Sequence, residues 1–332
     1  AHEKEERRDF RNALVAKMAE RLGHDAVYLS GGALSASFGV PDVGLLTLSE
    51  FVVAAEVLPA VDRRFASKTE ESPSFQRHVL PLLGRLGCNG RACHGSFQGQ
   101  GGFRLSLFGY DFEADHKALT GDDKPRVDRE QPEDSLMLLK PTQELPHKGG
   151  KRVTVGTWQH RIIQRWIEAG AAPVKDDDAE FLTLEVEPKE IVFQKLGDSK
   201  PLKVIAHWSD GTLEDVTPLC RFRSNDEATA SINESGRVTA TGKGDTDVVA
   251  FYDNGVAPVQ VLLPVSDRVG PKYPSVPTPT KIDELIVAKL CKLGVVPSEL
   301  CTDEEFLRRV SLDMTGTLPT PREVTEFVAD KS

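Results

Sequence analysis

The chain has 332 residues, a net charge of −10, 39% hydrophobic residues and 28% charged residues. Its length predicts two or three domains, and its composition is typical of folded globular protein. The acidic balance argues against a nucleic-acid binder, which needs a basic face, and no apolar run approaches the roughly 20 residues of a membrane span. Five cysteines are too few for a disulfide scaffold of this size.

Residues 1–58 have the pattern of a partial α/β unit. A charged helical pattern is followed by the apolar stretch "AVYLS", a Gly-rich loop and the helical stretch "TLSEFVVAAEVL". The strand has no second strand to pair with, so we expect no independent domain here. Residues 59–75 are polar and predict a linker. The chain begins without an initiator Met or a signal-peptide pattern and ends within a helical pattern, so both ends look cut and we expect a piece of a longer protein.

Residues 76–172 predict a mainly helical domain. A helical pattern runs into Cys88, and a second helix follows in "GTWQHRIIQRWIEAGA", where Trp158, Ile162 and Trp166 share one face. The intervening segment is rich in glycine, which lets the backbone lie close to a flat ligand.

The stretch "GCNGRACHG" within this region contains Cys88, Cys93 and His94. A Cys-x-x-Cys-His run is typical of covalent haem attachment, but here four residues separate the cysteines. An ideal helix would splay cysteines at this spacing, so the segment must bulge, and Asn89 and Gly90 both tolerate the positive φ of a bulge. The spacing alone leaves three possibilities open: a haem site, a small Cys88–Cys93 disulfide, or a metal knuckle, although zinc would want a further ligand at matching spacing.

Three other histidines in or near this region, His78, His116 and His160, lie on polar, helix-like faces of the pattern. We therefore expect them to be solvated surface residues.

Residues 182–264 change to a strand-like alternation, with "SDGT", "ESG" and "DNG" as turns, and predict an all-β sandwich. Residues 265–280 are a Pro-rich linker. Residues 281–332 return to a helical pattern, with capping boxes before "FLRRV" and "VTEFV". Cys291 and Cys301 could pair in an oxidising compartment, and free thiols are an equal alternative.

The motif-bearing region resembles a known family over roughly residues 74–172. The stretches "LGCNGRACHGSFQGQGGFRLSLFGYDFEAD", "HKGGKRV" and "RIIQRWIEAGA" are similar to the planctomycete-type cytochrome c domain of very large exported proteins. Members of that subgroup carry the same stretched motif. The resemblance implies haem c, with Cys88 and Cys93 as the thioether links and His94 as the proximal iron ligand.

The distal ligand follows from the same resemblance. Related cytochrome domains often carry Met-Pro-Pro-x-Gly just before the last helix, and the corresponding run here is "ELPHKGG". Leu145 stands where the Met would be and cannot ligate iron, whereas His147, two residues on, can. The resemblance therefore implies His147, with Met137 in "SLMLL" or an open, water-bound position as the alternatives.

The flanking regions also resemble known families. The runs "WSDGTLEDVT" and "SGRVTATGKG" are similar to bacterial Ig-like domains of group 2. The run "DEEFLRRVSLDMTGTLPTPREV" is similar to the start of an uncharacterised domain that follows these modules in the same planctomycete proteins. That resemblance implies that residues 281–332 begin a helical domain of unknown function.

The N-terminal run "GHDAVYLSGGALSASFGVPDVGLLTLSE" resembles the isocitrate lyase and phosphoenolpyruvate mutase superfamily. The resemblance implies that Ser30, Gly31 and Gly32 would contact the substrate and that Asp42 would lie near a metal. The later acidic metal-binding strand and catalytic loop of that family are missing, and a β/α barrel cannot close from one unit. We therefore expect no lyase activity.

Together these features predict a multidomain protein in the periplasm or on the cell surface: a c-type cytochrome that passes electrons through haem c to an unidentified redox partner protein. Two alternatives stay open. One is a surface adhesion or carbohydrate-binding protein with a Cys88–Cys93 disulfide and no haem. The other is a redox-linked enzyme whose active site lies in the C-terminal domain beyond residues 281–332, with haem as its electron acceptor.

Overall fold

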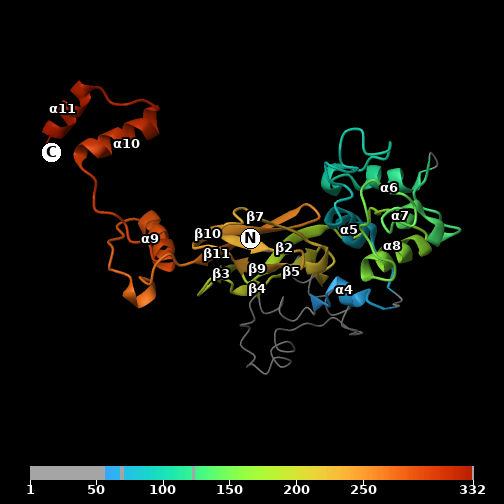
Figure 1. The fold of residues 1–332 in the computed structure, drawn as a ribbon. Coiled ribbons are helices and arrows are strands. Elements are labelled where there is room, and N and C mark those ends of the chain that lie inside the picture. Colours follow the sequence, from blue (N-terminus) through green and yellow to red (C-terminus); the bar gives the residue numbers. More distant parts are fainter. Residues whose placement is uncertain (1–56, 68–70, 122–123, 331–332) are drawn as a thin grey trace, which may run out of the picture. The chain divides into compact units, whose positions relative to one another are not determined.

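The computed structural model describes residues 57–67, 71–121 and 124–330, and the chain divides into two compact units after Leu263 (Figure 1). The first unit contains a helical part and a β-sandwich, and the second contains three helices. Helices at the start of the described chain, central sheets and helices at the end agree with the expected order of fold types.

The helical part of the first unit consists of short helices joined by long loops. Its central packing contact is between Phe75 and Trp166, whose rings stack with their centres 5.2 Å apart. Ile162, Ile163 and Ile167 are buried on the same helix as Trp166, as the amphipathic pattern predicts. The helices are α4 (Val61–Arg64), η1 (Phe75–Val79), α5 (Leu80–Arg85), η2 (Leu107–Gly109), α6 (Phe112–Thr120), η3 (Pro132–Asp134), α7 (Leu136–Leu139) and α8 (Trp158–Glu168).

The sandwich is formed by short strands whose side chains alternate between the interior and solvent. In β10, for example, Val248, Ala250 and Tyr252 point into the core. Two four-stranded sheets, in the orders β1-β6-β5-β2 and β3-β11-β10-β7, pack together through β2 and β11, and a three-stranded sheet β4-β9-β8 completes the fold. The strands are β1 (Val57–Leu58), β2 (Phe181–Glu187), β3 (Glu190–Val192), β4 (Ser199–Pro201), β5 (Lys203–Trp208), β6 (Leu213–Asp215), β7 (Arg221–Ser224), β8 (Ala230–Ile232), β9 (Arg237–Ala240), β10 (Gly244–Tyr252) and β11 (Gly255–Leu263).

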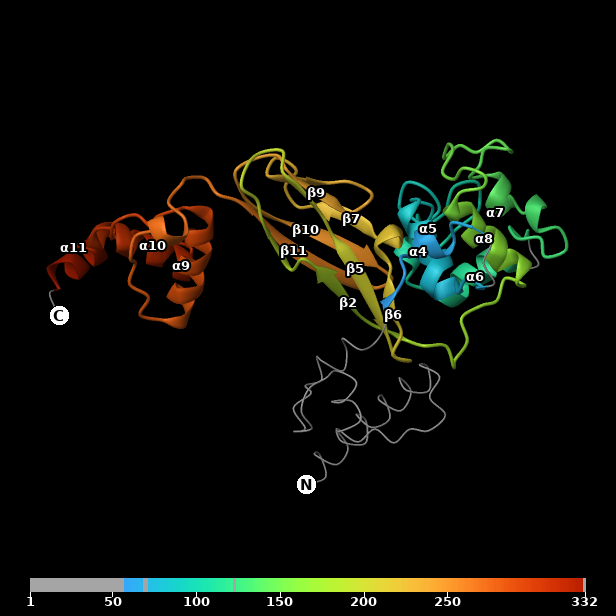
Figure 2. The ribbon, with the colours of Figure 1, turned by 90° about the horizontal axis from the view of Figure 1, so that it is seen from below.

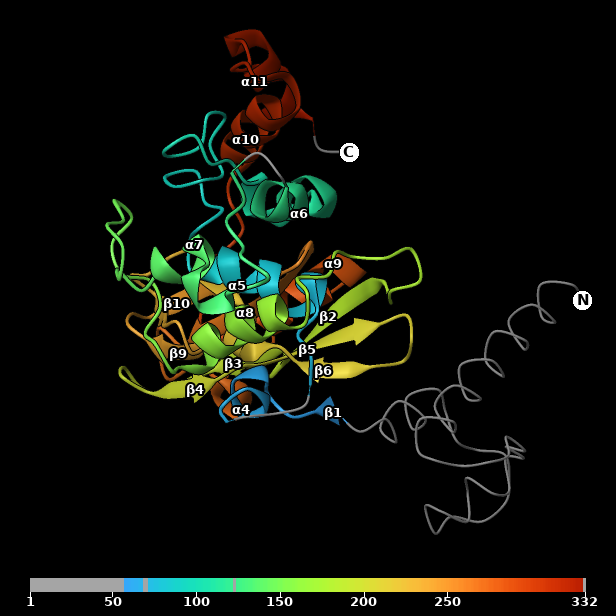
Figure 3. The same cartoon turned by 90° about the vertical axis from the view of Figure 1, so that its right-hand side faces the viewer.

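The first described segment of the chain, residues 57–65, belongs to the core, which corrects two expectations. Val57–Leu58, expected at the end of a helix, forms strand β1 and pairs in parallel with β6 (Figure 3). The expected polar linker 59–75 contributes Val61 and Phe65, both fully buried. These two apolar side chains, one helical turn apart, have a partner surface that the local sequence does not reveal. The other residues of the predicted α/β unit 1–58 lie outside the described part of the chain.

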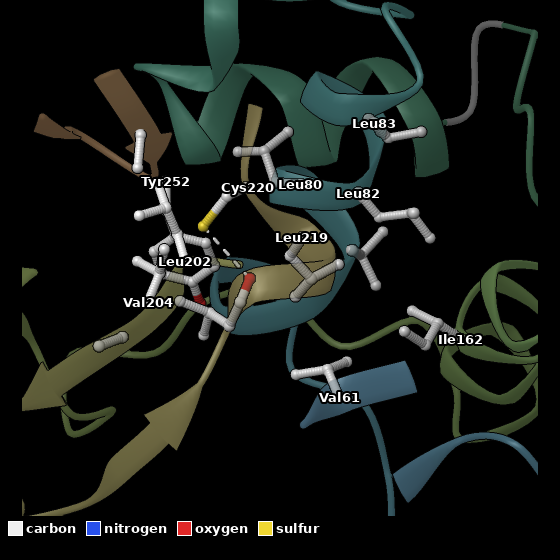
Figure 4. Close-up of a cluster of buried hydrophobic side chains, with 14 of the residues drawn as sticks. Val61, Leu80, Leu82, Leu83, Ile162, Leu202, Val204, Leu219, Cys220 and Tyr252 are labelled. Carbon is white, nitrogen blue, oxygen red and sulfur yellow. Dashed lines mark hydrogen bonds between the residues drawn. The ribbon is translucent and has the colours of Figure 1, made fainter. Parts of the chain in front are cut away.

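The helical part and the sandwich lie side by side (Figure 2) and share one hydrophobic core (Figure 4). Val61 and Leu80 of the helical part lie in the same buried cluster as Leu219, Cys220 and Tyr252 of the sandwich. The two parts therefore form one structural unit and are not independent domains joined by a flexible segment.

A buried ionic cluster, made of His78, Glu214 and Arg64, connects the two parts. His78 is only 3% exposed, so its prediction as a solvated surface residue is wrong. The backbone N–H of Ser74 donates to Nδ1 of His78, so the ring proton lies on Nε2, which donates to Glu214 at 2.8 Å. Arg64 also donates to the Glu214 carboxylate. The histidine is buried because its partner comes from β6, far along the chain.

Polar contacts around this cluster strengthen the connection. Arg77 donates to Asp210 at 2.8 Å, and its guanidinium lies 4.4 Å from the centre of the Trp208 ring. The hydroxyl of Tyr252 donates to the backbone carbonyl of Arg77 at 2.6 Å. Helix η1 is therefore held against the sandwich through both its side chains and its backbone.

The second unit consists of α9 (Lys281–Leu293), α10 (Asp303–Thr315) and α11 (Pro321–Ala329), preceded by η5 (Gly270–Lys272). The two predicted capping boxes are present, and a third begins α9. Cys291 and Cys301 are free thiols. In the ranges that the structure describes, no helix is both long and apolar enough to cross a bilayer.

The buried ionic cluster predicts a pH-dependent stability. Burial alone would raise the pKa of Glu214, but His78 and Arg64 outweigh it and hold that pKa below its ordinary value. A carboxylate with a lowered pKa stabilises the fold at neutral pH and loses that contribution as the pH falls through the folded-state pKa. We expect Glu214→Gln to cost about 3 kcal/mol or more at pH 7, because Arg64 and His78 lose a buried charged partner.

Urea unfolding followed by tryptophan fluorescence at pH 7 and pH 4 measures this difference. The control is Glu185→Gln, which removes a partly exposed carboxylate that pairs with His207 at 3.1 Å and should cost about 1 kcal/mol or less. The gap between wild type and Glu214→Gln should narrow at the lower pH. A gap that widens in acid, or equals that of the control at pH 7, would contradict the assignment.

Candidate functional site

The loop that carries Cys88, Cys93 and His94 follows directly from α5 and folds back on itself. The backbone N–H of Cys88 donates to the carbonyl of Leu83 in α5, and the N–H of His94 donates to the carbonyl of Cys88, each at 2.9 Å. These bonds bring both ends of the motif together after the helix has ended. The expected bulge is therefore present as a closed loop.

The way in which this loop leaves the helix differs from the expectation. Positive φ was expected at Asn89 and Gly90, but the left-handed residue is Gly87, with a φ of 77°. Gly87 comes directly after the helix-capping residue Leu86, which is the usual place for a left-handed glycine. Asn89 does not bulge outward, and its side chain is fully buried.

A cavity of about 860 Å³ opens beside this loop and contains all the predicted site residues in its lining. Such a volume is within the range of small-molecule and cofactor sites, about 300–1,000 Å³. Many of the lining side chains are apolar, among them Leu83, Leu105 and Leu119. The structure thus brings together residues far apart in the sequence: Cys88, Cys93, His94, His147 and the alternative candidate Met137. Of the expected histidines outside the motif, His116 and His160 do not line this cavity.

The two cavity histidines are each oriented by a backbone carbonyl. Nδ1 of His94 bonds to the carbonyl of Phe103 at 3.0 Å, and Nδ1 of His147 bonds to the carbonyl of Gly150 at 2.9 Å. Because a carbonyl can only accept, Nδ1 of each ring carries a proton, and Nε2 is the nitrogen that can offer a lone pair to a metal ion. The ring centres are 6.3 Å apart and the ring planes differ by 19°.

Burial sets the protonation states of the motif. It lowers the pKa of His94, and the neighbouring His147 and Arg126 lower it further against the opposing effect of the Phe103 carbonyl. His94 is therefore neutral at neutral pH and can act as a ligand. Burial also raises the pKa of Cys88 to about 12, with a further contribution from Cys93, so Cys88 is a protonated thiol.

The cavity lining also contains four cationic side chains that the sequence interpretation did not single out: Arg126, Lys140, Lys148 and Arg152. Arg126 lies with its guanidinium 4.9 Å from the centre of the Phe103 ring. Arg152 and Lys148 lie in the run "HKGGKRV", which already pointed to the site. Nothing in the run around Arg126 indicates that it would reach the same cavity.

The sequence left two alternatives to a haem site, a Cys88–Cys93 disulfide and a metal knuckle. Cys88 and Cys93 are both free thiols. Among the described residues, no group of three or more His, Cys, Asp or Glu side chains could hold a metal ion by itself.

One family matches the C-terminal part of the chain. Residues 281–332 match the family described as "PSCyt2: Protein of unknown function (DUF1549)". This agrees with the expected start of an uncharacterised domain.

Curated relatives match only a short part of the chain. It is 46% identical over 52 residues to 2-methylisocitrate lyase of Aeropyrum pernix, covering 16% of this chain and 17% of the lyase. It is 48% identical over 46 residues to 2-methylisocitrate lyase of Vibrio cholerae, covering 14% of this chain and 15% of that lyase. The expected resemblance to that superfamily is thus present, but the chain spans less than a fifth of these enzymes.

Some solved structures match about a quarter of the chain. Domains 5–6 of the S-layer protein SbsC match with 18% identity and a TM-score of 0.24, over 28% of this chain and 48% of SbsC domains 5–6. An intimin mutant of EHEC O157:H7 matches with 19% identity and a TM-score of 0.19, over 26% of this chain and 49% of the intimin chain.

The orientation of His94 predicts a difference between two neighbouring glycines. Gly99 and Gly101 have φ angles of 63° and 64°, so alanine costs roughly 1 kcal/mol of backbone strain at either position. A Cβ on Gly99 would lie 2.0 Å from the carbonyl oxygen of Phe103, which accepts from His94, whereas a Cβ on Gly101 would meet nothing within 4 Å. Gly99→Ala should therefore displace that carbonyl, and Gly101→Ala should not.

Two measurements distinguish these variants. Gly99→Ala should lower the urea midpoint clearly more than Gly101→Ala and should shift the imidazole NMR signals of His94. Equal midpoints together with unchanged His94 signals would mean that the Phe103 carbonyl does not orient the ring.

Proposed function

We propose that residues 76–172 bind haem c covalently and that the protein is an exported, multidomain electron carrier. The observation that carries this proposal is the pair of imidazoles, His94 and His147, that line one cavity at a separation suited to a single metal ion between them. The Cys88 and Cys93 thiols line the same cavity.

The separation of the two rings supports ligation by both. An imidazole nitrogen lies about 1.2 Å from its ring centre and binds a transition metal at about 2.0–2.1 Å, so two imidazoles on opposite sides of one metal have centres about 6.5 Å apart. The ring centres of His94 and His147 are 6.3 Å apart.

The carbonyl bonds support the same interpretation. Histidine ligands commonly donate their second ring N–H to a carbonyl or carboxylate, which fixes the tautomer and the ring orientation. His94 and His147 both follow this pattern through Phe103 and Gly150. A solvated loop histidine would not need such a partner.

The cysteines supply the covalent links. Cys88 and Cys93 would hold the ligand by addition of each S–H across a vinyl C=C, in which sulfur would bond to one carbon and hydrogen to the other, so that no oxidant would be required. Burial favours the protonated thiol of Cys88, which retains the hydrogen that this addition uses.

When bound, the haem iron would supply one-electron transfer between its ferrous and ferric states. The part of the chain is to bind the ligand, set its potential and limit access of water. Two imidazoles favour ferric iron more than the His/Met pair of many cytochromes c, so we propose a comparatively low potential. The partner is an unidentified redox protein, and the adhesion alternative is tested by the first experiment below.

Covalent attachment is tested by producing the full chain in the periplasm with a cytochrome c maturation system. We expect haem that stays with the denatured polypeptide in mass spectrometry and a c-type pyridine haemochrome spectrum. Cys88→Ala and Cys93→Ala should each leave at most one thioether, which shifts the α-band, whereas the control Cys291→Ala in the second unit should leave the spectrum unchanged. Wild-type protein without haem would refute the proposal and favour the adhesion alternative.

Ligation by His147 is tested by His147→Ala. We expect the low-spin spectrum to be lost and the potential to rise, because the strong imidazole donor is removed. The control His160→Ala changes a histidine on α8 outside the cavity, and Met137→Leu removes the alternative thioether with little change of volume. A low-spin spectrum that survives His147→Ala but is lost in Met137→Leu would assign the distal position to Met137.

A further inference from the structure

We propose that Asp115 on α6 is a positioning residue for His94, because its buried carboxylate holds the segment of residues 103–106 that orients the His94 ring. This inference rests on the proposed function, in which His94 is an iron ligand, and it deepens that function by naming what fixes the direction of the ligand. Asp115 does not line the cavity, so it acts through the intervening segment.

The first observation is that residues 103–106 hold His94 at two points. The carbonyl of Phe103 accepts from Nδ1 of the ring at 3.0 Å, and the backbone N–H of Leu105 donates to the backbone carbonyl of His94 at 2.8 Å. The path of this segment therefore determines both where the backbone of His94 lies and which way its ring faces.

The second observation is that this segment has no regular structure of its own. Residues 103–106 belong to no helix, and among the described residues their strand-like pairing is limited to an isolated bridge between Gln100 and Phe103. Its path therefore depends on tertiary contacts. Leu105 is buried and supplies apolar packing, but packing of this kind is non-directional and does not fix where a backbone carbonyl points.

The directional contact comes from Asp115, whose side chain is fully buried. One carboxylate oxygen accepts from the backbone N–H of Ser106, and the other accepts from the Ser106 hydroxyl at 2.6 Å. The same hydroxyl accepts from the backbone N–H of Asp111, the N-cap residue of α6, at 3.1 Å. Ser106 is thus held against the first turn of α6 through both its backbone and its side chain.

Stability alone does not explain a carboxylate at this position. Burial raises the pKa of Asp115 and the nearby Asp111 adds to this effect, whereas the bonds from Ser106 oppose it; among the described residues, no cation contributes. A buried charge without a counter-ion costs free energy. Hydrogen bonds to an ionised acceptor are about twice as strong as neutral ones, so the carboxylate holds Ser106 more firmly than an amide of the same shape would.

His147 provides an internal comparison. Its Nδ1 bonds to the carbonyl of Gly150, three residues further along the same loop, so its orientation is set locally. A change at Asp115 should therefore disturb one of the two cavity histidines and leave the other as it is.

The first test follows the imidazole NMR signals of both histidines in the full chain without ligand. Asp115→Ala removes both bonds to Ser106, so we expect the Nδ1 signal of His94 to shift while that of His147 stays in place. Asp115→Asn keeps an oxygen that can accept from the Ser106 N–H and should give a smaller shift. Ser106→Ala removes the hydroxyl bond and provides the same test if circular dichroism shows that Asp115→Ala does not fold.

Two controls separate positioning from a general loss of stability. Asp111→Asn removes a carboxylate from the N-cap of α6, where asparagine caps equally well, and should leave His94 unchanged. Glu214→Gln breaks the buried ionic cluster and destabilises the fold without a direct contact to residues 103–106. Equal shifts of His94 in Glu214→Gln and Asp115→Ala would indicate general loosening and would overturn the positioning role.

The second readout is the potential of the protein after maturation with haem c. A histidine ligand that donates its second ring N–H is a stronger donor, and hydrogen bonding of this kind is one of the factors that set the potential. Loss of the Phe103 bond should therefore raise the potential. We expect the largest rise in Asp115→Ala, a smaller one in Asp115→Asn, and the wild-type value in Glu214→Gln.

The outcomes distinguish this inference from the proposed function. An unchanged His94 signal in folded Asp115→Ala would overturn the positioning role and leave haem binding intact. A shifted His94 signal in a chain that takes up no haem would overturn the proposed function, whereas the positioning of the ring by Asp115 would stand. A shifted signal together with a raised potential would support both.

Discussion

A helical region that encloses a large cavity has to bury its apolar side chains somewhere else. The helical part of the first unit surrounds about 860 Å³ of open space, so the interior of its own fold cannot supply a full core. Its helices instead share a core with the sandwich, through Leu80 on one side and Leu219 and Tyr252 on the other. The buried ionic cluster of His78, Glu214 and Arg64 lies at the same junction. The sandwich therefore acts as the structural support of the cavity.

The site itself depends on backbone groups more than on side chains. Two backbone carbonyls fix the tautomers of His94 and His147, and two hydrogen bonds between backbone groups close the loop that carries the cysteines. The positions of backbone acceptors are determined by the path of the chain, so the orientation of the two histidines depends on the conformation of the loops. The glycines make the path sterically possible: a Cβ on Gly149, for example, would lie 2.7 Å from Cε1 of His147.

The local parts of this architecture could be predicted from the sequence. Capping boxes, alternating strands and the amphipathic α8 depend on near neighbours, and the motif around Cys88 and His94 is itself local. The expectation that His147 lies close to His94 came from the family resemblance. The separation of the two residues along the chain does not by itself predict that they lie together. Contacts between remote residues were missed for a physical reason. In the sequence, Val61 and Phe65 lie in a polar stretch and His78 lies on a polar face. In the fold, all three are buried, and Glu214 of the sandwich is the partner of His78.

The junction also has a consequence for the order of events during synthesis. Glu214 follows His78 by 136 positions, so a ribosome releases the whole helical part before it makes the carboxylate that pairs with His78 and Arg64. Domains that fold alone can close as soon as they emerge. Here part of the surface that buries the helices is made after them, so the helical part cannot reach its final packing until the sandwich has been made. The motif cysteines are therefore made long before the strands that support their loop.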